Sequence, residues 1–222
     1  MKDVKNMNDY DVRNFYDFCK IIEKLRSPGG CPWDREQTHK SLSKHLIEEA
    51  YEAYDAIEEN SKEHIMEELG DVLLQIVMHA QIGKEEGEFD IGDVIDSVGQ
   101  KMIDRHPHVF GNTQVKSSSE VLDNWEEIKK QQRGQKTVTE SINSLSRSLP
   151  ALYKTQKVID KVKRAKIDCI NPSQKAVTQE QIGQKLFEIC VLAYENKVDA
   201  EMALSSYTKK FIKKIKNIEE NT

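Results

Sequence analysis

Glycine and proline are scarce in this sequence, with 10 and 5 residues among 222. Apolar residues recur at spacings of three and four rather than two, and no segment shows a convincing strand pattern. Few residues are therefore available to interrupt long helices, and turn residues gather in short stretches. We predict an all-α fold.

Long apolar runs are also missing, because the most apolar segment, 72–78, is too short to cross a bilayer. The first residues are not followed by the apolar core of a secretory signal. The four cysteines include no C-x-x-C pair, which argues against a zinc knuckle or a disulfide framework and indicates reduced thiols. We expect a cytoplasmic protein without a membrane partner.

An excess of positive charge is absent as well. Lys and Arg number 33 against 38 Asp and Glu, which leaves a formal net charge of -5. The chain as a whole therefore does not attract nucleic acid, and we expect no nucleic-acid partner. An anionic substrate would require a bound cation or a local group of basic side chains.

Four helices with apolar stripes are predicted in the first half, at 9–26, 38–59, 61–85 and 90–105. The short connection between the second and third predicts that these two are antiparallel neighbours. A shorter helix that carries Trp125 is expected after a serine cap, and helical patterns resume from residue 149 to the end.

Acidic residues follow a regular spacing on the second and third predicted helices. Glu48, Glu49 and Glu52 lie on one, and Glu68 and Asp71 lie on the other. The i, i+3 spacing places carboxylates on one face of each helix, and antiparallel pairing would bring the two faces together. Their repulsion would be reversed by Mg²⁺ or Mn²⁺, which in turn favours a phosphate-bearing ligand.

The acids alone leave a second interpretation open, since exposed acidic faces without a metal are common in charge-rich chains. A di-iron carboxylate bundle is less well supported. It requires two Glu-x-x-His motifs, and the sequence offers only Glu36 with His39, beside a loop.

Four motifs surround and include these acids. They are G-C-P-W-D-R-E-Q-T at 30–38, E-E-x-x-E at 48–52, E-x-x-D at 68–71 and R-H-P-H-V-F-G at 105–111. In these motifs, which together cover about 25–129, the sequence resembles the MazG family of nucleoside triphosphate pyrophosphohydrolases.

The resemblance implies an all-α fold related to dimeric dUTPases, with tandem MazG-like helical domains and a four-helix-bundle type core formed on dimerisation. We expect a catalytic domain at 1–132, a linker at 133–148 and a degenerate second copy at 149–222. In that second copy, Gln181 and Gln184 stand where acids are expected. The expected assembly is a homodimer, with a tetramer left open.

The resemblance also implies cleavage of NTPs or dNTPs between the α and β phosphates, which yields a nucleoside monophosphate and pyrophosphate. The implied cofactor is Mg²⁺, with Mn²⁺ as the alternative. By motif position, the metal ligands are Glu49, Glu52, Glu68 and Asp71. Glu48 joins them as a catalytic residue, either at a second ion or beside the attacking water. The substrate-binding residues are Lys101 and Arg105 for the triphosphate and Trp125 near the base.

Two further interpretations stay open at this point. One is a catalytically weak nucleotide-sensing or scaffold dimer, and the other is an enzyme specific for a single nucleotide. An enzyme of broad substrate specificity would suit removal of noncanonical nucleotides or control of nucleotide levels under stress. The sequence leaves the base, the sugar and the number of metal ions open.

Overall fold

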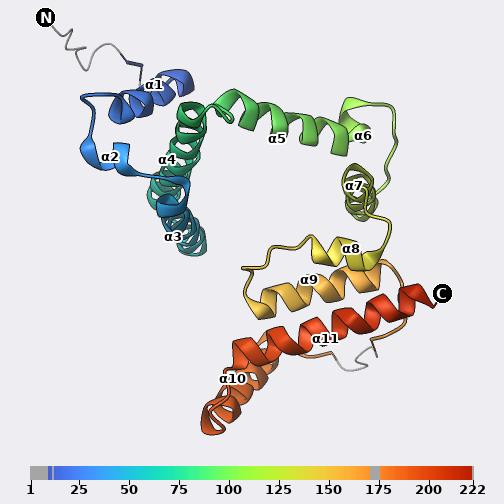
Figure 1. The fold of residues 1–222 in the computed structure, drawn as a ribbon. Coiled ribbons are helices and arrows are strands. Elements are labelled where there is room, and N and C mark those ends of the chain that lie inside the picture. The colour runs from blue at the N-terminus through green and yellow to red at the C-terminus, as the bar shows by residue number, and fades with distance from the viewer. Residues whose placement is uncertain (1–9, 12, 171–175, 222) are drawn as a thin grey trace, which may run out of the picture. The chain divides into compact units, whose positions relative to one another are not determined.

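The computed structural model describes residues 10–11, 13–170 and 176–221 (Figure 1). Within these ranges the chain forms helices and no strand, which confirms the predicted all-α fold. None of these helices combines the length and the hydropathy needed to cross a membrane.

The chain divides into two compact units, 1–104 and 105–222, and each is described by itself. The domain boundaries expected from the sequence stay a prediction. The first unit holds α1 (Phe15–Arg26), α2 (Pro32–Glu36), α3 (His39–Glu58), α4 (Lys62–Glu86) and α5 (Ile91–Arg105), whose last residue begins the second unit. The second unit holds α6 (Pro107–Phe110), α7 (Ser118–Gln132), α8 (Val138–Asn143), α9 (Ala151–Arg164), α10 (Gln179–Glu195) and α11 (Ala200–Glu220).

Polar caps fix where the helices of the first unit begin. The side chain of Asn14 accepts two backbone amides, so α1 begins at Phe15. The predicted start at position 9 lies outside the described residues. Thr38 forms a capping box at the start of α3, and α4 ends at Gly87, whose φ of 73° few other residues tolerate.

The α3–α4 hairpin forms the framework of the first unit, and α1 packs against α4 (Figure 1). The turn between α3 and α4 contains Asn60 at a positive φ of 54°, which asparagine accepts more readily than most residues. One group of buried side chains joins the three helices: Ile22 from α1, Leu42 from α3, and Val77, Met78 and Ile82 from α4.

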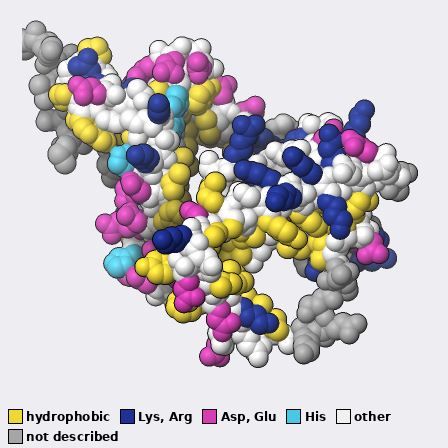
Figure 2. Space-filling model, turned by 60° about the horizontal axis from the view of Figure 1, so that its bottom comes forward, with side chains coloured by type: hydrophobic (Ala, Val, Ile, Leu, Met, Phe, Trp, Pro, Cys, Tyr) yellow, Lys and Arg dark blue, Asp and Glu magenta, His cyan; other side chains and the backbone are white. Residues whose placement is uncertain are grey.

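Other parts of the predicted apolar stripes are exposed in this single chain, although such a stripe on a helix is expected to face a core. The core residues of α4 lie in its second half, where α1 covers it, and its first half has no such cover among the described residues. Hydrophobic side chains are visible on the surface in Figure 2. The exposed residues of these stripes are Ile57, Leu69, Leu73, Ile76, Ile95 and Val98.

Arg26 connects the core to the loop that precedes α3. Its side chain is 5% exposed, and its guanidinium forms an ion pair with Glu85 of α4, with an Nη2–Oε2 distance of 2.7 Å. It also donates to the backbone carbonyls of Asp34 and Gln37. Burial opposes ionisation of Glu85, but hydrogen bonds from Arg26 and Gln81 outweigh it and hold the pKa of this carboxyl below its usual range. The start of α3 is therefore fixed to α4.

The second unit has a separate core made by α8, α9 and α11. The segment 133–148, predicted as a linker, contains α8, and Ile142 on that helix is 1% exposed. Glu219 of α11 accepts the backbone amides of Val138 and Thr139, which caps α8. A helix of six residues is too short to show an apolar period, so the sequence analysis missed it. The buried residues of this core are Ile142, Val158, Val162 and Ile215.

Replacing Ile142 tests whether α8 belongs to this core. We expect Ile142→Ala to lower the free energy of unfolding by about 2–5 kcal/mol, because it leaves a cavity in a packed interior. Asn143→Ala, at an exposed position of the same helix, should change it by less than about 0.5 kcal/mol. Denaturant titration followed by circular dichroism measures both, and equal, small effects would mean that the segment does not pack.

Candidate metal centre

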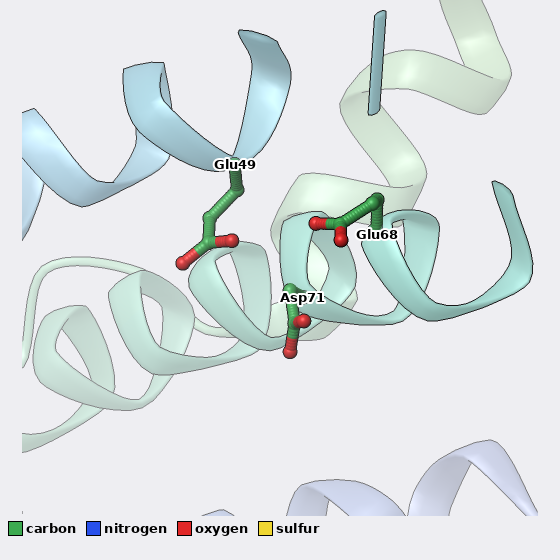
Figure 3. A group of neighbouring side chains, drawn as sticks. All are labelled: Glu49, Glu68 and Asp71. Atoms are coloured by element: carbon green, nitrogen blue, oxygen red, sulfur yellow. The ribbon is translucent and has the colours of Figure 1, made fainter. Parts of the chain in front are cut away.

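The α3–α4 hairpin brings three of the predicted acids together. Glu49 comes from α3, and Glu68 and Asp71 come from α4 one turn apart (Figure 3). One carboxylate oxygen from each of them lies within 4.8 Å of the others. In the part of the chain that the structure describes, no other group of three potential metal ligands is this close.

The electrostatics of this cluster disfavour three free negative charges. The pKa of Glu49 is raised, chiefly by burial and then by the carboxylates of Asp71, Glu52 and Glu68. The pKa of Glu68 is raised by burial and by the neighbouring carboxylates of Glu52 and Asp71. Removal from water and mutual repulsion therefore act in the same direction.

Glu68 supplies a more specific sign that these acids fit a cation. Its Oε2 atom is buried and has no hydrogen-bond partner among the described residues. A buried carboxylate oxygen without a partner is costly unless a cation or donor meets it. Carboxylate oxygens are the ligands that Mg²⁺ and Mn²⁺ prefer, so Glu49, Glu68 and Asp71 fit a hard divalent cation.

The other two predicted acids lie outside this group of three. Glu52 is exposed on α3, yet its charge is close enough to raise the pKa of both Glu49 and Glu68. Glu48 is exposed, and its Oε2 atom lies 3.0 Å from Nδ1 of His45. The roles expected for Glu48 and Glu52 stay predictions.

The predicted substrate contacts are spread over both units. Lys101 is exposed on α5, and its ammonium donates to Ser97 at 2.9 Å. Arg105, the first residue of the second unit, donates to Gln132 at 3.0 Å. Trp125 of α7 lies edge-on to the ring of His106, with 5.0 Å between the centroids. Their roles toward a substrate stay predictions, because each unit is described without the other.

The glutamines of the second unit do not form a comparable site. The side-chain oxygen of Gln181 accepts the amide of Thr178 in the capping box of α10. Gln184 donates to Glu188 one turn along the same helix. Both side chains are engaged in local hydrogen bonds, and neither can contribute the negative charge that a metal site needs.

Arg26, which fixes the start of α3, was not singled out from the sequence, because only the end of a helix was expected there. Its signal in the sequence is weak: one arginine before Ser-Pro-Gly-Gly, in a chain with 33 basic residues. What distinguishes it is burial and the carbonyls it holds, and neither can be seen from spacing.

The sequence of this chain is similar to those of known proteins. The family model of the MazG nucleotide pyrophosphohydrolase domain matches residues 37–110, which include all five predicted acids. The chain is 40% identical to the nucleoside triphosphate pyrophosphohydrolase/pyrophosphatase MazG of Thermotoga maritima, over 93% of this chain and 86% of that protein. It is 36% identical to the nucleoside triphosphate pyrophosphohydrolase of Escherichia coli K12, over 90% of this chain and 84% of that protein.

A third relative matches only part of its own length. The uncharacterized protein YabN of Bacillus subtilis is 51% identical over 146 residues, which are 65% of this chain and 29% of YabN. The likeness to this protein therefore concerns one part of a longer chain.

Cation binding at the cluster is testable through stability. At 100 times its dissociation constant, Mg²⁺ or Mn²⁺ should raise the free energy of unfolding of the wild type by about 2.7 kcal/mol. The Glu68→Gln/Asp71→Asn variant should gain nothing, yet in EDTA it should unfold at a higher temperature than the wild type, because repulsion is removed. Thermal unfolding measures both effects.

The matched control is Asp55→Asn/Glu58→Gln, which makes the same chemical changes at exposed positions of α3. It should respond to the cation as the wild type does. An equal response in all three proteins would show that the cation binds elsewhere.

Proposed function

This chain belongs to the MazG family of nucleoside triphosphate pyrophosphohydrolases, and we propose that it hydrolyses its substrates at a divalent cation held between α3 and α4. The observation that carries the proposal is the convergence of Glu49, Glu68 and Asp71, with one buried carboxylate oxygen left without a partner. We further propose that the bond cleaved is the one between the α and β phosphates of an NTP or dNTP.

The residues of this centre would have different roles in hydrolysis. When bound, Mg²⁺ or Mn²⁺ would neutralise phosphate charge and make a water molecule more acidic. Glu49, Glu68 and Asp71 would hold it, with Glu52 at the edge of the site. Glu48, which lies beside His45 in this structure, would orient the attacking water or accept its proton.

Cationic and aromatic side chains complete the proposed site. Lys101 and Arg105, both on α5, would bind the phosphates. The ammonium of Lys101 would act as a compact positive charge, and the planar guanidinium of Arg105 could donate two hydrogen bonds at once. Trp125 would lie against the base. Such contacts favour the leaving pyrophosphate by matching the charge that grows on it, and no covalent intermediate is required.

We propose that catalysis belongs to the α3–α4 centre alone. The second unit has no cluster of acids among its described residues, and Gln181 is already engaged in capping α10. A neutral amide oxygen in place of a carboxylate binds a divalent cation more weakly. The second unit would then serve in packing and assembly.

We propose that the chain assembles as a homodimer, and exposed apolar side chains on the hairpin support this. Tyr51 and Tyr54 on α3 and Met66, Leu69 and Leu73 on α4 are between 37% and 74% exposed. Large apolar side chains exposed in number on one hairpin are typical of an interface, and a two-fold dimer is the commonest closed solution. A four-helix core would result if two hairpins met on these faces.

We also propose a cytoplasmic location. A reducing compartment suits a chain whose thiols are unpaired. The free cysteines are Cys19, Cys31, Cys169 and Cys190.

Turnover tests the proposed chemistry. We expect Glu68→Gln/Asp71→Asn to lower pyrophosphate release by at least about 100-fold, since it removes two ligands of the cation. EDTA should have the same effect on the wild type. Phosphorus NMR of the products distinguishes a monophosphate with pyrophosphate from a diphosphate with orthophosphate.

The Asp55→Asn/Glu58→Gln control should keep its activity, and a panel of canonical and modified NTPs and dNTPs would rank substrates. A folded wild type that binds Mg²⁺ and hydrolyses none of them would instead indicate a nucleotide-sensing or scaffold dimer.

A charge on the exposed apolar face should break the proposed dimer. We expect Leu73→Glu to shift the mass in solution from two chains to one, because the interface would have to bury an unpaired carboxylate. Ser43→Glu adds the same charge at an exposed polar position of α3 and should stay dimeric. Light scattering after gel filtration measures the mass, and a wild type that is already monomeric would refute the dimer.

A further inference from the structure

A cavity of about 540 Å³ lies in the second unit, between the segment that joins α8 to α9 and one face of α11. This volume falls in the range that small-molecule sites occupy. Its wall has a cationic part and an apolar part. The cations are Arg147, Lys154 and Lys209, and the apolar side chains are Ile142, Leu145, Leu149 and Ile212.

The cationic side chains of this cavity form no ion pair with a carboxylate in the described part of the chain, although Glu201 lies beside the wall, where it accepts the amide of Ala151. No Asp or Glu is among its lining residues. Arg147 and Lys209 form no ion pair within the described part of the chain. The ammonium of Lys154 donates to the carbonyl of Ser146 at 3.2 Å, which leaves its charge uncompensated. Three like charges around one cavity favour a ligand that is itself multiply negative.

Other polar groups at the cavity are already engaged. Glu201 accepts the amide of Ala151 and so occupies the amino end of α9. The hydroxyl of Thr208 pairs with Thr155 at 2.7 Å and donates to the carbonyl of Leu204 at 2.8 Å. A ligand would therefore be held by the three cationic side chains, and neither the hydroxyl of Thr208 nor the carboxylate of Glu201 would contribute to its binding.

We propose that this cavity binds an oligophosphate, the phosphate chain of a nucleoside di- or triphosphate. A single carboxylate would meet one cation and leave two unpaired, whereas two or three linked phosphates can meet all three. The apolar wall suits the base and sugar of a nucleotide. This site is separate from the acidic centre, which belongs to the other unit, and binding at it requires neither a divalent cation nor hydrolysis.

Calorimetry on the full chain tests the site. The protein is the Glu68→Gln/Asp71→Asn variant in EDTA, so that the acidic centre cannot hold a cation or turn over substrate. The probes are ATP, AMP and inorganic pyrophosphate. Adding Lys154→Gln/Lys209→Gln should weaken ATP binding by roughly tenfold or more, because two charge-assisted contacts are lost.

The matched control is Lys213→Gln/Lys214→Gln, which removes the same charge from exposed positions of α11 outside the cavity. It should bind ATP unchanged, and Lys154→Arg/Lys209→Arg should largely keep binding. Circular dichroism and thermal unfolding establish that each variant is folded. Equal weakening in both glutamine variants would mean general charge attraction and would overturn the proposal.

Hydrogen exchange then locates the bound nucleotide. ATP should slow amide exchange in segments 142–154 and 205–212, and the Lys154→Gln/Lys209→Gln variant should lose this protection. If pyrophosphate binds as tightly as ATP, the cavity recognises the phosphates alone. If ATP binds more tightly, the apolar wall also contributes to binding, through the base and sugar. Equal binding of AMP, or no protection of these segments, would refute the oligophosphate site.

Discussion

Three carboxylates with oxygens within 4.8 Å repel one another, and the α3–α4 hairpin has to hold them there. It is anchored at its far end, where Val77 and Ile82 of α4 pack with α1 and where Arg26 pairs with Glu85. The acids lie toward the turn, away from that packing. Part of the free energy that holds the acids together therefore comes from contacts at the other end of the hairpin.

The same half of α4 carries both the acids and an exposed apolar face. Glu68 and Asp71 alternate along the helix with Leu69 and Leu73, which are 52% and 37% exposed. A second copy covering these leucines would also exclude water from the carboxylates. Their repulsion would then be screened less, so assembly and cation binding would favour each other. Under the proposed function, a dimer is thus part of the site and not only of the fold.

The second unit has a core of its own around Val158 and Ile215, and helix α8 lies within the segment that was predicted to be a linker. Helix starts such as Thr38 were predictable, because a cap acts within one turn of chain. The burial of Ile142 was not, because it depends on α9 and α11, which follow much later in the sequence.

The sequence by itself determined the long helices, the antiparallel hairpin and the acids at i, i+3 spacing, because each depends on residues within a few turns of one another. Only the tertiary structure decided that Glu49 meets Glu68 and Asp71. It also decided which apolar residues are covered. These outcomes depend on what distant segments place beside a side chain, and local periodicity carries no information about that.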